Sequence, residues 1–200
     1  MLFLITNRKL AQNKNFYKVI EEAISAGIYA VILREKDLSY ELLLPIAVKI
    51  KEIIGNSGVK LIINNNIEVA KVINADGYHT NFISFIKERL SFSGTIGVSV
   101  HSLEEAMEAE EHGANYILLG HIFETDCKKG VPPKGIEFIK IIKNHINIPI
   151  ISLGGIQPAN AHLVMEAGSD GVAVMSSIMK AKDPYLLVSE YIISMRSFNH

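Results

Sequence analysis

The sequence predicts an α/β fold, a single (β/α)8 TIM barrel that occupies residues 1–200. Short β-rich runs alternate with longer amphipathic stretches from one end of the chain to the other. Most of the β-rich runs are continuously apolar, which is typical of parallel strands covered on both faces. Roughly eight strand–helix units in 200 residues reach the lower size limit of this barrel.

The expected elements follow one another in strict alternation. The expected strands are residues 2–6, 30–34, 60–64, 77–80, 95–100, 116–120, 149–153 and 171–175. The expected helices are residues 16–26, 40–54, 67–73, 83–90, 103–112, 136–144, 160–167 and 185–195, and a short one opens near 176. Four of them are followed by a glycine that favours a helix stop, namely Gly27, Gly55, Gly113 and Gly168.

A Rossmann-like sheet is the alternative fold. It would be favoured by a glycine-rich nucleotide loop after the first strand, but the sequence there is Thr6-Asn7-Arg8-Lys9. Since no linker or low-complexity segment interrupts the chain, we expect one domain.

Composition narrows the class of protein. Apolar residues make up 48% of the chain and charged residues 20%, values that argue against disorder. No apolar stretch approaches the ~18 residues of a membrane span. The net charge of −1 gives no global field to recruit nucleic acid. The one cysteine, Cys127, and the lack of a basic leader at Met1 predict a cytoplasmic protein.

In such a barrel the active site lies at the carboxyl ends of the strands. The residues at these ends are polar or cationic, with hardly any carboxylate among them, so they predict a cup for an anion. They are Thr6, Arg34, Lys36, Asn64, Asn65, His79, Ser99, His101, His121, Gly154, Gly155, Met175, Ser176 and Ser177.

Two segments point to a phosphate. Leu153-Gly154-Gly155-Ile156 follows the seventh strand and Met175-Ser176-Ser177-Ile178 follows the eighth. The loops after these two strands form a recurrent phosphate site in barrels, in which glycines admit backbone N–H groups and serines add donors. The alternative interpretation is a tight turn at Gly-Gly and a helix cap at Ser176.

Arg34 and Lys36 are two residues apart on a strand end, so they share a face and can hold a second anionic group. Glu35 is expected to point away from that face. The alternative is a solvated charge cluster from residue 34 to residue 37.

The connection from His121 to Lys134 is the longest in the chain and is typical of a lid or binding loop. Lys128 in this loop either reaches a phosphate or carries a solvated charge. Cys127 has no identifiable base beside it, so we do not expect it to be a nucleophile.

His121 follows Gly120 at the end of the sixth strand, where an imidazole can both take and give a proton. A metal site built from His79, His101 and His121 has no obvious carboxylate partner, so no metal site is predicted.

Seven short motifs, in order from the second strand to the eighth, resemble the thiamine phosphate synthase superfamily. They are Leu33-Arg34-Glu35-Lys36, Leu61-Ile62-Ile63-Asn64-Asn65, Ala75-Asp76-Gly77-Tyr78-His79, Ile96-Gly97-Val98-Ser99, Gly120-His121-Ile122-Phe123-Glu124-Thr125, Gly154-Gly155-Ile156 and Gly171-Val172-Ala173-Val174-Met175-Ser176-Ser177. The resemblance implies a barrel whose ligands are thiazole phosphates and, in the synthases, also an aminopyrimidine diphosphate.

Two departures separate the branches of this superfamily. Synthases carry magnesium on two aspartates, at positions that hold Asn65 and Ser84 here, and these are poor ligands for a hard cation. The run from Gly120 to Gly130 looks like the thiazole tautomerases of the TenI type, in which the histidine matching His121 transfers the proton.

The resemblance therefore implies an isomerase of thiamine biosynthesis that aromatises a carboxylated dihydrothiazole ethyl phosphate by a 1,3-proton shift without a cofactor. His121 would be catalytic. The substrate-binding residues would be Arg34, Lys36, Asn64, Lys128, Gly154, Gly155, Met175, Ser176 and Ser177.

Two alternatives remain at this point. A thiamine phosphate synthase is compatible with Lys128, which aligns with the lysine of the synthase loop. A non-catalytic regulator that binds a thiazole phosphate would keep the cup and lose the reaction. In each case the partner is a small thiazole phosphate, not nucleic acid or a membrane. Because small barrels of this superfamily often pair, the resemblance also gives a homodimer as an expectation.

Overall fold

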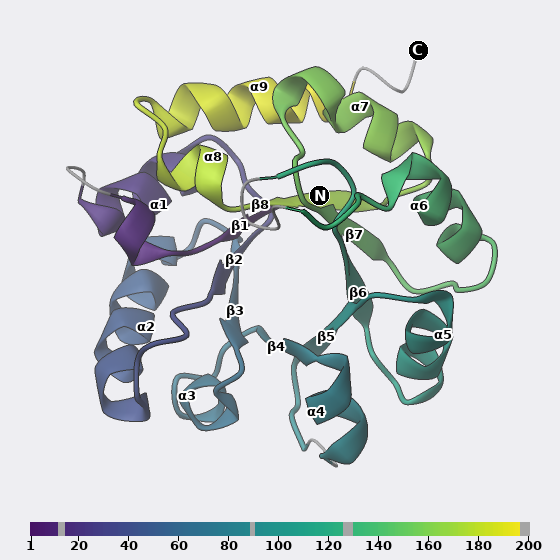
Figure 1. Ribbon diagram of the computed structural model, residues 1–200. Helices are drawn as coiled ribbons and strands as arrows, with labels where there is room; N and C mark the ends of the chain where they lie inside the picture. Colours follow the sequence, from purple (N-terminus) through teal and green to yellow (C-terminus); the bar gives the residue numbers. More distant parts are fainter. Residues whose placement is uncertain (12–14, 89–90, 126–129, 197–200) are drawn as a thin grey trace.

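The computed structural model describes residues 1–11, 15–88, 91–125 and 130–196. Eight parallel strands close into a barrel in which each strand pairs with its neighbours in sequence, and β1 pairs with β8 (Figure 1). Helices surround the barrel and alternate with the strands. The predicted (β/α)8 barrel is confirmed.

The strands are short and buried. Their bounds are β1 Leu2–Ile5, β2 Ala30–Leu33, β3 Lys60–Asn64, β4 Gly77–Asn81, β5 Thr95–Val100, β6 Tyr116–Gly120, β7 Ile150–Leu153 and β8 Gly171–Val174. Each end lies within one residue of the expected end. A continuous apolar run, ended by a glycine or a polar residue, therefore marks most of the strands in this chain.

The helices lie between the strands. Their bounds are α1 Phe16–Ser25, α2 Tyr40–Ile54, α3 Ile67–Val72, α4 Phe82–Lys87, α5 Leu103–Glu111, α6 Gly135–Lys143, α7 Pro158–Glu166, α8 Ser176–Met179 and α9 Pro184–Arg196. One element was not expected, the 3-10 helix η1 at Arg8–Leu10. Three residues are too few to show a helical period in a sequence.

The core has two layers, because successive side chains of a strand point to opposite sides. Phe3 and Ile5 pack inside the barrel with residues such as Tyr116 and Leu118. Leu2 and Leu4 point outward and join the larger core beneath the helices. The barrel therefore has a filled interior.

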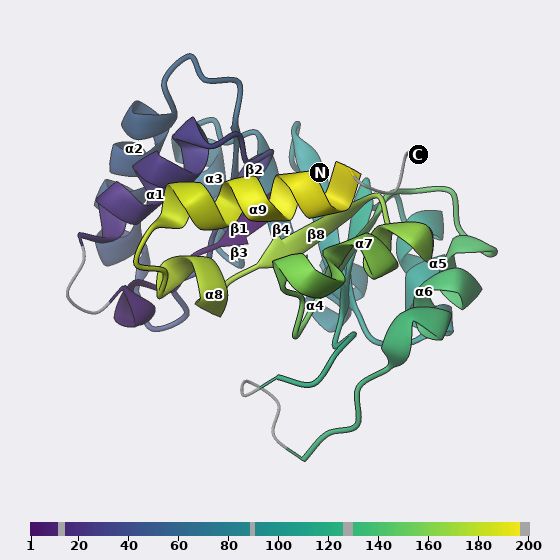
Figure 2. The same ribbon diagram turned by 90° about the horizontal axis from the view of Figure 1, so that it is seen from above.

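The last helix, α9, packs against other helices of the outer layer. α9 packs against α7, α1 and α8 on one side of the barrel (Figure 2). Among the described residues, no helix is both long enough and apolar enough to cross a bilayer.

Candidate active site

A cavity of about 950 Å³ opens at the carboxyl ends of the strands. Nine of the predicted site residues line it: Arg34, Lys36, Asn64, His121, Gly154, Gly155, Met175, Ser176 and Ser177. The tenth, Lys128, lies outside the described residues. The side chains expected to act together therefore share one cavity.

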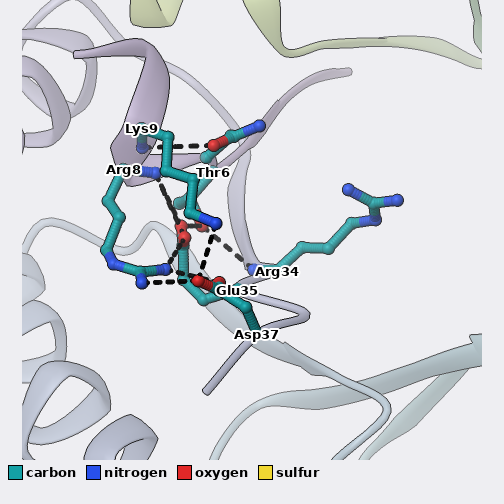
Figure 3. Close-up of polar contacts among 7 residues, drawn as sticks. Thr6, Arg8, Lys9, Arg34, Glu35 and Asp37 are labelled. Carbon is teal, nitrogen blue, oxygen red and sulfur yellow. Dashed lines mark hydrogen bonds and ion pairs between the residues drawn. The ribbon is translucent and has the colours of Figure 1, made fainter. Parts of the chain in front are cut away.

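Arg34 and Glu35 leave the end of β2 in opposite directions (Figure 3). The carboxylate of Glu35 is buried, with 6% exposure of the residue, and accepts hydrogen bonds from Thr6 Oγ1 at 2.8 Å and from the backbone N–H of Arg8 at 3.0 Å. Arg34 lines the cavity instead. The expected direction of Glu35 is confirmed.

Asp37 belongs to the same outward group. Its carboxylate accepts two hydrogen bonds from the Arg8 guanidinium, at 2.7 and 2.8 Å, and also pairs with Lys9 at 2.8 Å. The Arg8 hydrogen bonds, followed by the Lys9 one, hold the pKa of Asp37 well below its usual range. The charged run is therefore divided: Arg34 and Lys36 line the cavity, while Glu35 and Asp37 bind Arg8.

Gly154 and Gly155 allow two loops of the cavity wall to touch. Both have positive φ, 106° and 65°. A Cβ on Gly154 would lie 3.1 Å from the Cα of His121, and one on Gly155 would overlap the carbonyl oxygen of Glu124. The backbone also joins the loops, because Phe123 N–H donates to Gly154 O at 2.9 Å. Glycine is thus required here for close approach as well as for a turn.

His121 is buried, with 3% of the residue exposed, and it lines the cavity. Its Nε2 lies 3.3 Å from the carbonyl oxygen of Val131. In the part of the chain that the structure describes, its Nδ1 has no hydrogen-bond partner. Because a carbonyl only accepts, Nε2 carries the proton in this contact, so Nδ1 of a neutral ring would be an acceptor.

The sequence placed His79 at the rim of the expected cup without a catalytic or binding role, and the structure places it in the cavity wall. Its Nε2 lies 2.8 Å from Ser99 Oγ and its Nδ1 lies 3.0 Å from Tyr116 Oη. Burial, and then the charge of Arg34, lowers the pKa of His79 to about 3. Its position one residue before the end of an expected strand was the available signal.

The residues that would hold a divalent cation do not fit one. Asn65 lines the cavity, and Ser84 in α4 receives a hydrogen bond from the amide of Asn81 at 3.0 Å. No cluster of three His, Cys, Asp or Glu side chains occurs within the described ranges. Neutral amides and hydroxyls alone are weak ligands for a hard cation, which prefers carboxylates.

Fold and cavity together define a class, a (β/α)8 barrel with a cation-lined cavity at the carboxyl ends of its strands. The sequence signature of TMP-TENI, thiamine monophosphate synthase, matches residues 2–178, and the chain belongs to this family.

The relatives and solved structures agree with this placement. The chain is 43% identical to the thiamine-phosphate synthase of Clostridium acetobutylicum, over 90% of this chain and 88% of that protein. It is 37% identical to the thiamine-phosphate synthase of Chloroflexus aurantiacus, over 91% and 86% of the two chains. The structure of thiamine phosphate pyrophosphorylase from Pyrococcus furiosus superposes with a TM-score of 0.86 and 28% identity, covering 100% of this chain and 96% of that one.

These relatives correct one expectation. The prediction of an isomerase, a thiazole tautomerase, is wrong, because the relatives at 35–43% identity are named thiamine-phosphate synthase. That prediction depended on one run after β6 and on two missing carboxylates. A single run does not separate reactions that share the same barrel, whereas the match to these relatives extends over about nine tenths of the chain.

Proposed function

We propose that this chain acts as a thiamine-phosphate synthase, a transferase that joins an aminopyrimidine, supplied as its diphosphate, to a thiazole phosphate and releases diphosphate. The observation that supports this most is the pairing of two anion-binding groups in one cavity. Arg34 and Lys36 lie at the end of β2, and residues 154–155 and 175–177 lie at the ends of β7 and β8. A reaction between two phosphorylated substrates needs two such groups.

The residues divide between the two substrates as follows. The backbone N–H groups of Gly154 and Gly155, with Ser176, bind the phosphate of the thiazole. The guanidinium and ammonium of Arg34 and Lys36 bind the diphosphate. Asn64, Met175 and Ser177 complete the cavity wall, and Lys128 adds a cation to the diphosphate.

His121 contributes a polar contact to a substrate. Its Nδ1 is buried without a partner among the described residues. A buried nitrogen without a hydrogen bond costs about 1–3 kcal/mol, which a ligand N–H or O–H would offset. The family's metal chemistry is not assigned to this chain, because Asn65 and Ser84 do not supply the carboxylates.

That same mismatch favours a second candidate, a protein that binds the thiazole phosphate without turnover. Loss of the carboxylates removes the charge that would hold a cation against a leaving diphosphate. The cavity wall that binds a phosphate would remain intact.

One experiment separates the two candidates. The purified chain is mixed with thiazole phosphate and aminopyrimidine diphosphate, with Mg²⁺ or with a chelator, and thiamine phosphate and diphosphate are measured. Equal amounts of both products, lost in Lys36→Met but kept in the control Lys49→Met on the exposed face of α2, support the synthase. Binding of thiazole phosphate without product supports the binder. Absence of both product and binding excludes both.

A further inference from the structure

Tyr191 connects two parts of the cavity wall from outside the cavity. It lies on α9 and is fully buried. Its hydroxyl donates to the carbonyl oxygen of Ile156 at 2.8 Å and lies 3.0 Å from Ser177 Oγ. Ile156 follows the glycine pair after β7, and Ser177 follows β8.

The direction of these hydrogen bonds follows from the number of protons. A carbonyl oxygen only accepts, so Tyr191 gives its one hydroxyl proton to Ile156. The contact with Ser177 is therefore made by the Ser177 hydroxyl, which donates to Tyr191. The hydroxyl proton of Ser177 is then used, and in this arrangement it cannot bind a phosphate oxygen, which is itself an acceptor.

The phenol keeps its proton near neutral pH. Burial raises the pKa of Tyr191 above its ordinary value. The hydrogen bond from the Tyr191 hydroxyl to the Ile156 carbonyl oxygen therefore persists at neutral and mildly alkaline pH.

We propose that Tyr191 is a positioning residue that fixes the spacing between residues 154–156 and residues 175–177, so that their N–H groups converge on one phosphate. This inference rests on the proposed function only in taking these two segments as the phosphate site. It assigns Ser177 to the support of that site rather than to direct contact through its hydroxyl.

The test is a double-mutant cycle on phosphate affinity. Inorganic phosphate is titrated into the wild-type chain, Tyr191→Phe, Ser177→Ala and the double variant. Each titration is made at a temperature well below the thermal unfolding midpoint of the protein used. Tyr185→Phe is the matched control, since Tyr185 lies on the same helix and is 52% exposed. The KM for thiazole phosphate and kcat are measured in parallel.

Each single variant is expected to bind phosphate about fivefold more weakly, the cost of one lost hydrogen bond. The double variant is expected to lose no more than the singles, while the control is unchanged. KM should rise with little change in kcat, a split that a loss of folded protein would not give.

Three results would overturn the inference: unchanged affinity in Tyr191→Phe, additive losses in the double variant, or no phosphate binding by the wild type. Additive losses would show that the Ser177 hydroxyl binds phosphate by itself. A wild-type chain that binds phosphate but forms no thiamine phosphate would contradict the proposed function alone and would leave this inference standing.

Discussion

Thr6 Oγ1 donates to Glu35 Oε1 at 2.8 Å and accepts the backbone N–H of Arg34 at 3.0 Å. One buried hydroxyl thus joins the end of β1 to the end of β2. The hydroxyl thereby fixes the backbone from which the Arg34 side chain extends (Figure 3). The hydrogen bonds that hold Glu35 outside the cavity therefore also help to keep the side chain of Arg34 directed into it.

Thr6→Val should destabilise the fold and weaken anion binding, whereas Thr6→Ser should do neither to a comparable extent. Valine has the shape of threonine but leaves the Arg34 N–H and the Glu35 carboxylate each without one partner. The expected loss is about 2 kcal/mol in the free energy of unfolding. Urea unfolding and phosphate titration of both variants measure it. Equal behaviour of the two variants would mean that the hydroxyl holds nothing in place.

Gly155→Ala should be far more damaging than Gly58→Ala. Both glycines have positive φ, 65° and 81°, so both variants pay for a left-handed backbone, about 1–2 kcal/mol. Only at Gly155 does the added methyl also overlap the Glu124 carbonyl, whereas nothing lies within 4 Å at Gly58. Urea unfolding should show the larger loss for Gly155→Ala, together with weakened phosphate binding. Equal losses would show that the loops separate at no cost.

The sequence predicted the barrel because its signals are local. Most strands are apolar runs and four helices are followed closely by a glycine, so both signals can be found without knowing what lies beside them. The same reasoning located Arg34 and Gly154 by their position after a strand. It did not find Tyr191, because nothing in the sequence near this residue indicates contact with Ile156, 35 residues away. The sequence also predicted the wrong reaction, because the choice between tautomerase and synthase depended on the residues after β6 and on two missing carboxylates rather than on the whole chain.

The stability of the protein should depend on His79 in mildly acidic solution. The pKa of His79 is about 3 in the folded chain and near ~6.5 when unfolded, so between these values the unfolded chain binds the extra proton. The free energy of unfolding therefore falls as pH decreases through this window, by up to ~1.4 kcal/mol per pH unit. Above about pH 6.5 this contribution is constant.

His79→Gln should show a shallower decline than the wild type when urea unfolding is followed from pH 7 to pH 5. Glutamine keeps polar atoms for Ser99 and Tyr116 but does not titrate. The matched control is His145→Gln, an exposed histidine two residues after the end of α6. A wild-type slope in His79→Gln would mean that other groups carry the acid sensitivity.

Restoring carboxylates should make diphosphate binding sensitive to magnesium. Asn65 has φ 55°, a conformation that aspartate tolerates nearly as well as asparagine, so Asn65→Asp should fold. Combined with Ser84→Asp, it adds two carboxylates at the positions where the resemblance to the synthases implies magnesium ligands. Because a bound cation at phosphoryl oxygens is worth several kcal/mol, Mg²⁺ should tighten aminopyrimidine diphosphate binding about tenfold or more in the double variant. Calorimetry with and without chelator measures this, with Asn74→Asp, another asparagine at positive φ (47°), as the control. A wild-type chain that already gains as much from Mg²⁺ would contradict the view that amides and hydroxyls at this edge of the barrel cannot hold the ion.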